Sequence, residues 1–87
     1  MKKETFVYTV TDPNGLHARP AGLLVRKAQE LKGEVTISLR DRSASLKKLL
    51  AVMGLGIRHG DTVTVTVESE HAAEDAARLQ RFFSEHV

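Results

Sequence analysis

The chain has 87 residues, of which 41% are hydrophobic and 28% charged, with no cysteine and a formal net charge of +2. This length allows a two-layer core but no second core or deep catalytic cleft, so we expect residues 1–87 to form a single domain with its chemistry at the surface. The composition argues against disorder, and the lack of cysteine excludes disulfides and thiolate zinc sites. The small net charge argues against a dedicated nucleic-acid binder, which would concentrate Lys and Arg on one face.

The N-terminal residues Met1–Thr5 lead directly into an alternating pattern, without an apolar signal-peptide segment. No apolar run in the sequence is long enough to cross a bilayer. We therefore expect a cytoplasmic protein that is not inserted into a membrane.

The first predicted element is a half-buried strand over Thr5–Thr11. This segment is rich in β-branched and aromatic residues and places Phe6, Tyr8 and Val10 at period two. Asp12–Gly15 contains Pro, Asn and Gly and ends the strand.

An amphipathic helix is predicted from Ala18 to about Leu31, because apolar residues recur at steps of three and four. Pro20 fits only the first turn of this helix, where its missing N–H is not needed. Gly33 is placed to end the helix. Gly22, inside it, costs about 1 kcal/mol relative to Ala, which indicates a packing or docking reason for its presence.

The second half of the chain predicts a hairpin, a short helix, a strand and a final helix. Glu34–Leu39 alternates and Ser43–Leu46 can return beside it as a second strand. Lys47–Met53 is a brief and unusually apolar helical segment, and Thr62–Val67 has the strongest strand pattern in the chain. Ser69 is placed to cap the last helix, which presents on one face Ala72, Ala76, Leu79 and Phe83.

The predicted order is therefore β-α-β-β-α-β-α, without internal repeats or linkers. Four strands and three helices in so short a chain favour one antiparallel sheet with the helices packed on a single face. The predicted fold class is an α+β two-layer domain.

The main candidate site lies between the first strand and the first helix, over Asn14–Ala21. His17 stands at the helix N-terminus, where unpaired backbone N–H groups and the positive end of the dipole favour an anion. The same field disfavours an imidazolium ion, so one ring nitrogen should be free as a nucleophile. The N–H groups of Ala18 and Arg19 and the guanidinium of Arg19 are placed to bind the oxygens of a phosphoryl group.

Three further residues are expected to shape this loop. Gly15 permits backbone angles that other residues avoid, and Asn14 can tie the loop through a side-chain hydrogen bond. Pro20 offers no N–H, but its fixed φ holds the first helical turn. Each of these residues alone has an ordinary explanation; their combination with His17 and Arg19 favours a phosphate-handling site.

Gly15–Ala21 resembles the active-site signature of the phosphocarrier HPr family, and Val52–Ile57 resembles the end of that family's second helix and the following turn. The two segments have the separation that the family shows, and the resemblance covers essentially the whole chain. It implies an open-faced β-sandwich with a four-stranded antiparallel sheet and three helices on one side.

The resemblance also implies a covalent phosphoryl carrier rather than an enzyme. In such proteins the histidine matching His17 accepts a phosphoryl group at Nδ1 from phosphorylated enzyme I, which draws it from phosphoenolpyruvate. It then passes the group to the A domain of a sugar-specific enzyme II, and the match to Arg19 stabilises the phosphate. No cofactor or metal is required on the carrier. Lys48 stands where many Gram-positive members have a regulatory serine, which puts serine regulation in doubt.

The short second helix is too apolar to bury all its side chains, so part of it should form a docking surface for partner proteins. Leu50 and Met53 are expected at the centre, with Arg19 and Gly22 at the rim, while Leu49 and Val52 are expected to be ordinary core. Arg26 or Lys47 would attract acidic surfaces. The expected partner-binding residues are Gly22, Arg26, Lys47, Leu49, Leu50 and Met53.

Functions other than a phosphoryl relay are also consistent with parts of the sequence. A metal site would require the histidines of the chain to meet, and no pair of them has a spacing suited to binding a metal ion. These are His17, His59, His71 and His86. An RNA-binding sheet should display aromatic residues for base stacking, whereas this chain offers only Phe6 and Tyr8, in one strand. A paralogue that relays phosphate in nitrogen or metabolic regulation fits the same residues, so the pathway stays open. We expect a monomer.

Overall fold

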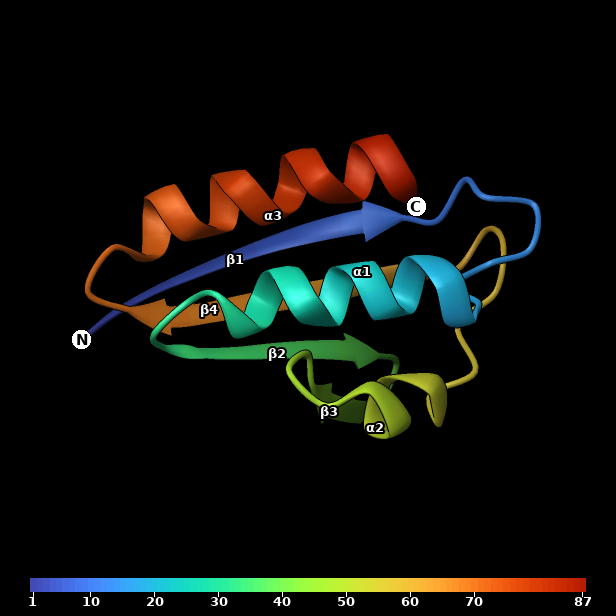
Figure 1. Ribbon diagram of the computed structural model, residues 1–87, viewed down its shortest axis with the longest axis horizontal. Helices are drawn as coiled ribbons and strands as arrows, with labels where there is room; N and C mark the ends of the chain where they lie inside the picture. The colour runs from blue at the N-terminus through green and yellow to red at the C-terminus, as the bar shows by residue number, and fades with distance from the viewer.

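The computed structural model describes residues 1–87 and has the predicted order of strands and helices (Figure 1). The elements are β1 (Lys2–Thr9), α1 (Ala18–Gln29), β2 (Glu34–Leu39), β3 (Arg42–Ser45), α2 (Leu49–Met53), β4 (Thr62–Ser69) and α3 (Ala72–His86). None of the three helices combines the length and hydropathy that a membrane crossing requires.

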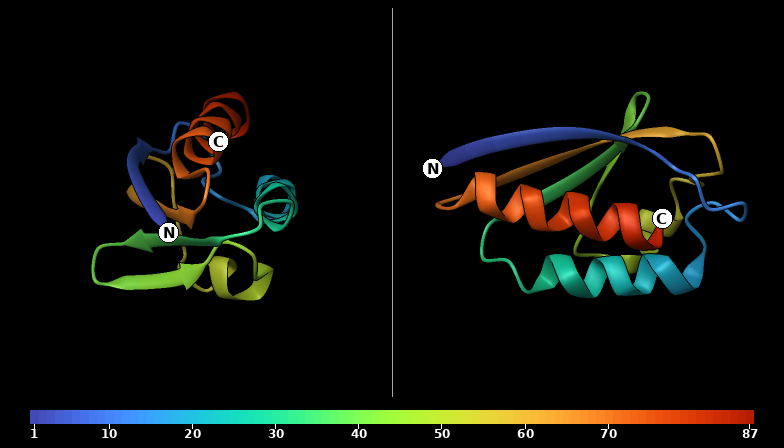
Figure 2. Two further views of the ribbon diagram at one scale, coloured as in Figure 1. Left: turned by 90° about the vertical axis from the view of Figure 1, so that its left-hand side faces the viewer. Right: turned by 90° about the horizontal axis from the view of Figure 1, so that it is seen from above.

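The four strands form one antiparallel sheet in the order β1-β4-β2-β3. The β4 strand is central and pairs along its whole length with β1, from Thr9 opposite Thr62 to Lys2 opposite Ser69. All three helices lie on one side of the sheet (Figure 2). The predicted α+β open-faced sandwich is therefore confirmed.

The core lies between the sheet and the helices because the strands alternate with period two. In β4, Val63, Val65 and Val67 are fully buried, while the threonines between them are only partly covered. Two threonine pairs cross from β1 to β4, and Thr9 Oγ1 lies 2.9 Å from Thr62 Oγ1. The helices contribute to the core Ala21, Leu24, Val25 and Ala28 from α1, Val52 from α2, and Ala72, Ala76, Leu79 and Phe83 from α3.

Several predicted element boundaries are wrong by two or three residues. The β1 strand covers Lys2–Thr9 rather than Thr5–Thr11, and α1 ends at Gln29. Strand β4 continues to Ser69, and α2 begins at Leu49. These ends depend on pairing and packing across the sheet, which the local residue pattern does not contain.

The predicted role of Gly33 as the residue that ends α1 is also wrong. The C-cap is Glu30, in an ordinary right-handed conformation. Gly33 instead passes close to the end of β4, where an added Cβ would overlap the carbonyl oxygen of Glu68 and the Cβ of Ser69. Glycine is needed there because the two backbone segments approach so closely.

The predicted capping of α3 by Ser69 is wrong as well. Ser69 is buried at the end of β4, and the N-cap residue is His71, which makes no side-chain capping bond. The Ser69 hydroxyl instead donates to the carboxylate of Asp75 at 2.8 Å. This bond joins the end of β4 to the first turn of α3.

Candidate functional site

The segment that contains His17 lies at one end of the molecule, beside the turn before β4 and the C-terminal residue (Figure 1). The backbone N–H of Leu16 donates to the Ile57 carbonyl at 3.1 Å. The N–H groups of Thr11 and Asp12 both donate to the Val87 carbonyl, at 3.0 and 2.8 Å. Segments remote in sequence therefore hold this loop in place.

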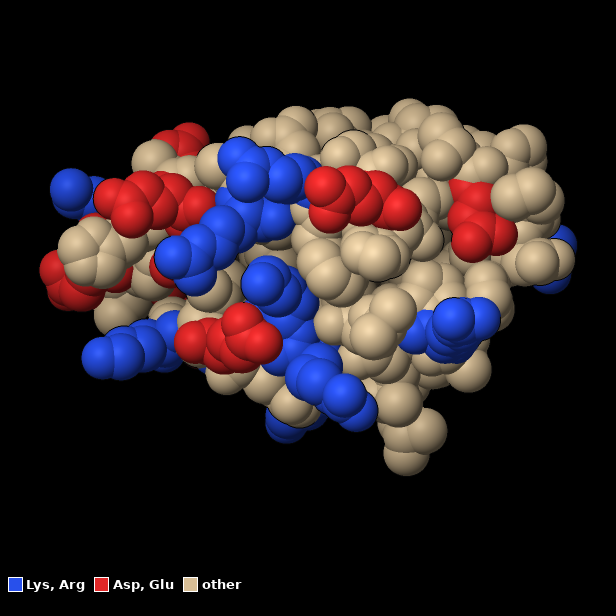
Figure 3. Space-filling model, turned by 45° about the horizontal axis from the view of Figure 1, so that its top comes forward, with Lys and Arg blue, Asp and Glu red and all other residues tan.

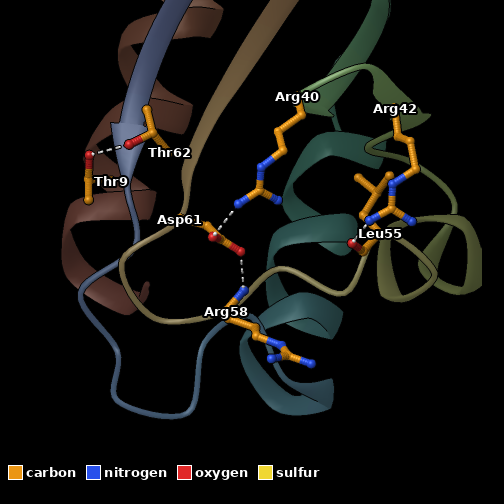
Figure 4. Close-up of polar contacts among 7 residues, drawn as sticks. All are labelled: Thr9, Arg40, Arg42, Leu55, Arg58, Asp61 and Thr62. Atoms are coloured by element: carbon orange, nitrogen blue, oxygen red, sulfur yellow. Dashed lines mark hydrogen bonds and ion pairs between the residues drawn. The ribbon is translucent and has the colours of Figure 1, made fainter.

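The turn that supports the loop is itself tied to the β2–β3 hairpin (Figure 4). Asp61 accepts the backbone N–H of Arg58 at 2.8 Å, and its other carboxylate oxygen lies 3.5 Å from an Arg40 nitrogen. Arg42 donates to the Leu55 carbonyl at 2.6 Å. These contacts connect the hairpin to the turn before β4. This turn contains the Ile57 carbonyl that accepts the N–H of Leu16.

Gly15 has a φ of +67°, in the left-handed region that glycine adopts most easily. An added Cβ would lie 2.7 Å from both the Arg58 Cα and the Ile57 carbonyl oxygen. The residue must therefore be small as well as flexible. Both demands arise because the loop lies directly on the turn before β4.

The expectation that the Asn14 side chain ties the loop is wrong. The side chain of Asn14 makes no hydrogen bond; its backbone N–H donates to Asp12 Oδ1 at 2.9 Å. The Asp12 carbonyl also accepts the N–H of Gly15 at 2.9 Å. Asp12 was not identified as a site residue from the sequence. An Asp side chain that accepts the backbone N–H two residues later is nevertheless a typical turn-forming arrangement, and Asp12 directly precedes Pro13, Asn14 and Gly15.

His17 is the N-cap residue of α1, with φ −85° and ψ −179°, and its carbonyl accepts the Ala21 N–H at 3.0 Å. The next two backbone N–H groups, of Ala18 and Arg19, have no hydrogen-bond partner. The imidazole is 40% exposed, and its Nε2 lies 3.6 Å from Asp12 Oδ2. The exposed ring therefore stands beside two free donors at the positive end of a helix.

A surface pocket of about 330 Å³ brings His17 and Arg19 together, as the sequence predicts. It also contains three residues that the sequence did not identify as site residues: Asp12, Leu23 and His86. His86 comes from the end of α3, where its ring packs on Phe82 with the centroids 4.3 Å apart. Larger hollows of about 880, 370 and 360 Å³ include neither His17 nor Arg19, and Gly33 lines the first two.

The α2 helix presents an apolar surface next to α1. Leu50 is 86% exposed and Met53 is half-buried, as the sequence predicts. Val52 is buried, so its expected place in the core is confirmed, whereas Leu49 is 40% exposed and the expectation that it is core is wrong. Leu23 of α1, also 40% exposed, lines the His17 pocket together with His86 of α3.

The other expected partner-binding residues differ in the contacts that they already make within the chain. Gly22 has open space around its Cα, so no packing within the chain requires glycine there. Arg26 is exposed and makes no ion pair. Lys47, by contrast, donates from Nζ to the Leu31 carbonyl and accepts from Gln29 through its own carbonyl, so it joins α1 to α2.

Charges of both signs are interspersed over the face shown in Figure 3. This face lacks the continuous basic surface that is typical of nucleic-acid-binding domains. No group of three or more histidine or carboxylate side chains is placed to hold a metal ion.

Comparisons with known proteins give a consistent result. A family described as "PTS HPr component phosphorylation site" matches residues 4–85. The phosphocarrier protein HPr of Lysinibacillus sphaericus is 42% identical over 67 residues, which are 77% of this chain and 76% of the relative.

Solved structures agree with the sequence matches. A histidine-containing phosphocarrier protein from Mycoplasma superposes with a TM-score of 0.90 at 27% identity, covering 94% of this chain and 93% of that one. A structure described as an HPr dimer, from Thermoanaerobacter tengcongensis, has a TM-score of 0.74 at 26% identity and covers 98% of this chain and 95% of that one.

Proposed function

Because this chain belongs to the HPr family of phosphocarrier proteins, we propose that His17 accepts a phosphoryl group from phosphorylated enzyme I and passes it to the A domain of a sugar-specific enzyme II. The observation that carries this proposal is the exposed imidazole of His17 beside the unpaired N–H groups of Ala18 and Arg19. The chain would act in the cytoplasm as a covalent carrier, a substrate of its partners rather than an enzyme.

The transfer chemistry needs a nucleophile, donors for the phosphoryl oxygens and accurate positioning. The imidazole of His17 would supply the lone pair. The free N–H groups of Ala18 and Arg19, with the helix dipole, would bind the phosphoryl oxygens after transfer. The guanidinium of Arg19 lines the same pocket and can reach these oxygens with two parallel donors.

The apolar surface of α2, beside α1, offers a place on which partners can dock. We assign docking to the exposed Leu49 and Leu50 and the half-buried Met53, and to Leu23 in the His17 pocket. Gly22 lets a partner approach α1 closely, since nothing in the chain itself fills that space. Arg26 provides the free charge for attraction to acidic partners, whereas Lys47 is already engaged by Leu31.

The first test is to incubate the purified chain with phosphoenolpyruvate, magnesium and enzyme I and to measure its intact mass. We expect one added phosphoryl group that is lost in acid. His17→Ala should abolish the addition, whereas His59→Ala, which removes another exposed histidine, should leave it unchanged.

Two results decide the assignment. Normal labelling of His17→Ala would show that another residue is the acceptor. Onward transfer to the A domain of a sugar-specific enzyme II would support sugar uptake, whereas phosphorylation without such transfer would favour a relay in nitrogen or metabolic regulation.

A further inference from the structure

We propose that Asp12 is a positioning residue for phosphoryl transfer. Its carboxylate holds the Nε2 proton of His17, so that the lone pair of the neutral ring lies on Nδ1 and the phosphoryl group is received there. This inference rests on the function proposed for His17, but it concerns a residue outside the Gly15–Ala21 signature.

The first observation is that Asp12 is held in place from several sides. Its backbone N–H donates to the Val87 carbonyl at 2.8 Å, and its carbonyl accepts the Gly15 N–H at 2.9 Å. One carboxylate oxygen, Oδ1, accepts the Asn14 N–H at 2.9 Å. With these groups engaged, the orientation of the side chain is defined, and the second oxygen, Oδ2, is the one that faces His17.

The second observation is which ring nitrogen Oδ2 faces. It lies 3.6 Å from Nε2, and the Asp12 side chain is only 25% exposed. The separation is slightly longer than a hydrogen bond, and a small rotation of the exposed ring would close it. Asp12 is also the only carboxylate that lines the His17 pocket.

These two observations define the tautomer of the ring. A neutral imidazole has one N–H donor and one lone pair, and the partner of one nitrogen decides which nitrogen carries the proton. A carboxylate can only accept, so it attracts the proton to Nε2. The lone pair of His17 is then on Nδ1.

The carboxylate also assists during transfer. The Nδ1 lone pair forms the new bond to phosphorus, while the bond from phosphorus to the donor's leaving atom breaks and its electron pair stays on that atom. The Nε2 proton remains on the ring, which gains positive charge as the new bond forms. The nearby charge of Asp12 favours this change. In metal sites, where a carboxylate likewise orients a histidine ring, loss of such an outer partner costs about tenfold or more.

The test uses Asp12→Asn in the full-length chain, with ¹⁵N-labelled histidine. Asn keeps an oxygen that can accept the Asn14 N–H, so the loop should retain its shape. Its NH₂ group then faces His17 and can only donate, which favours a lone pair on Nε2. We expect the ¹⁵N chemical shifts of the ring to move from the Nε2–H tautomer towards the Nδ1–H tautomer, and transfer from enzyme I to slow about tenfold.

Asp75→Asn is the matched control, because Asp75 also accepts a hydrogen bond, from the Ser69 hydroxyl at the opposite end of β4 from the His17 loop, and does not line the pocket. It should leave the His17 shifts and the transfer rate unchanged. Wild-type ring shifts in Asp12→Asn would overturn the proposal, even if transfer is slow, because the effect would then be one of loop shape. The shifts are measured on unphosphorylated protein, so they test Asp12 even if enzyme I fails to label the wild type.

Discussion

At the scale of single residues, the environment of His17 is built by neighbours with restricted alternatives. Gly15 combines a positive φ with a close contact to the turn before β4. Asp12 accepts the N–H of Asn14 with one carboxylate oxygen and faces His17 with the other. Small changes at these residues should therefore affect the loop much more than similar changes elsewhere.

Gly15→Ala is expected to destabilise the fold by about 2 kcal/mol or more, because a left-handed alanine alone costs about 1 kcal/mol and its Cβ would also overlap Arg58 and Ile57. Chemical denaturation followed by circular dichroism measures this change. Gly56→Ala is the control, since Gly56 has a φ of +63° but nothing near its Cβ position. Equal losses in the two variants would show that the contact with Arg58 and Ile57 has no cost.

At the scale of elements, α2 is the helix that depends most on tertiary contacts for its stability. It has five residues, and its N-cap Lys48 has an extended backbone with φ −121° and ψ 107° but makes no side-chain capping bond. Its position depends on Val52, which is buried, and on Lys47, which joins it to α1. The local sequence of α2 thus contributes little to its own stability.

Lys48→Ser is expected to stabilise the chain by about 0.5 to 1 kcal/mol, because a serine hydroxyl at the N-cap can accept one of the free N–H groups of the first turn. Thermal unfolding should show a rise in Tm of about 2 to 8 °C. Lys48→Ala removes the same charge without adding an acceptor and should not give this gain. A similar rise in both variants would attribute the effect to the loss of the lysine charge instead.

At the scale of the whole molecule, the two layers have different surfaces. The helix side contains the His17 pocket and the exposed Leu50, whereas the open side of the sheet has many hydroxyl groups. Val7 is 59% exposed in β1, next in sequence to the inward-facing Phe6, and so lies on the open side. If partners dock beside His17, substitutions of exposed residues should impair phosphoryl transfer on the helix side but not on the open side of the sheet.

Leu50→Glu is therefore expected to reduce the efficiency of transfer from enzyme I, kcat/KM, by about tenfold, in line with the loss of an apolar anchor worth about 1 to 2 kcal/mol. Val7→Glu introduces the same charge on the open side and should leave transfer unchanged. Steady-state phosphorylation kinetics measure both. Equal rates for the wild type and Leu50→Glu would remove α2 from the proposed docking surface.

Local residue patterns predict the type and order of all seven elements, because period-two and helical patterns arise from burying one face of each element. They also locate the His17 loop, since Pro20 and Gly15 have local conformational preferences that need no tertiary context.

Contacts between segments remote in sequence could be found only in the folded chain, because local residue patterns carry no information about them. Ser69 is a good capping residue, but its pairing with Lys2 keeps it in β4. Gly33 resembles a helix terminator, yet the approach of β4 is what requires it. The contact of Asp12 with His17 could not be inferred from spacing, because it depends on how Ile57 and Val87 hold the loop from outside.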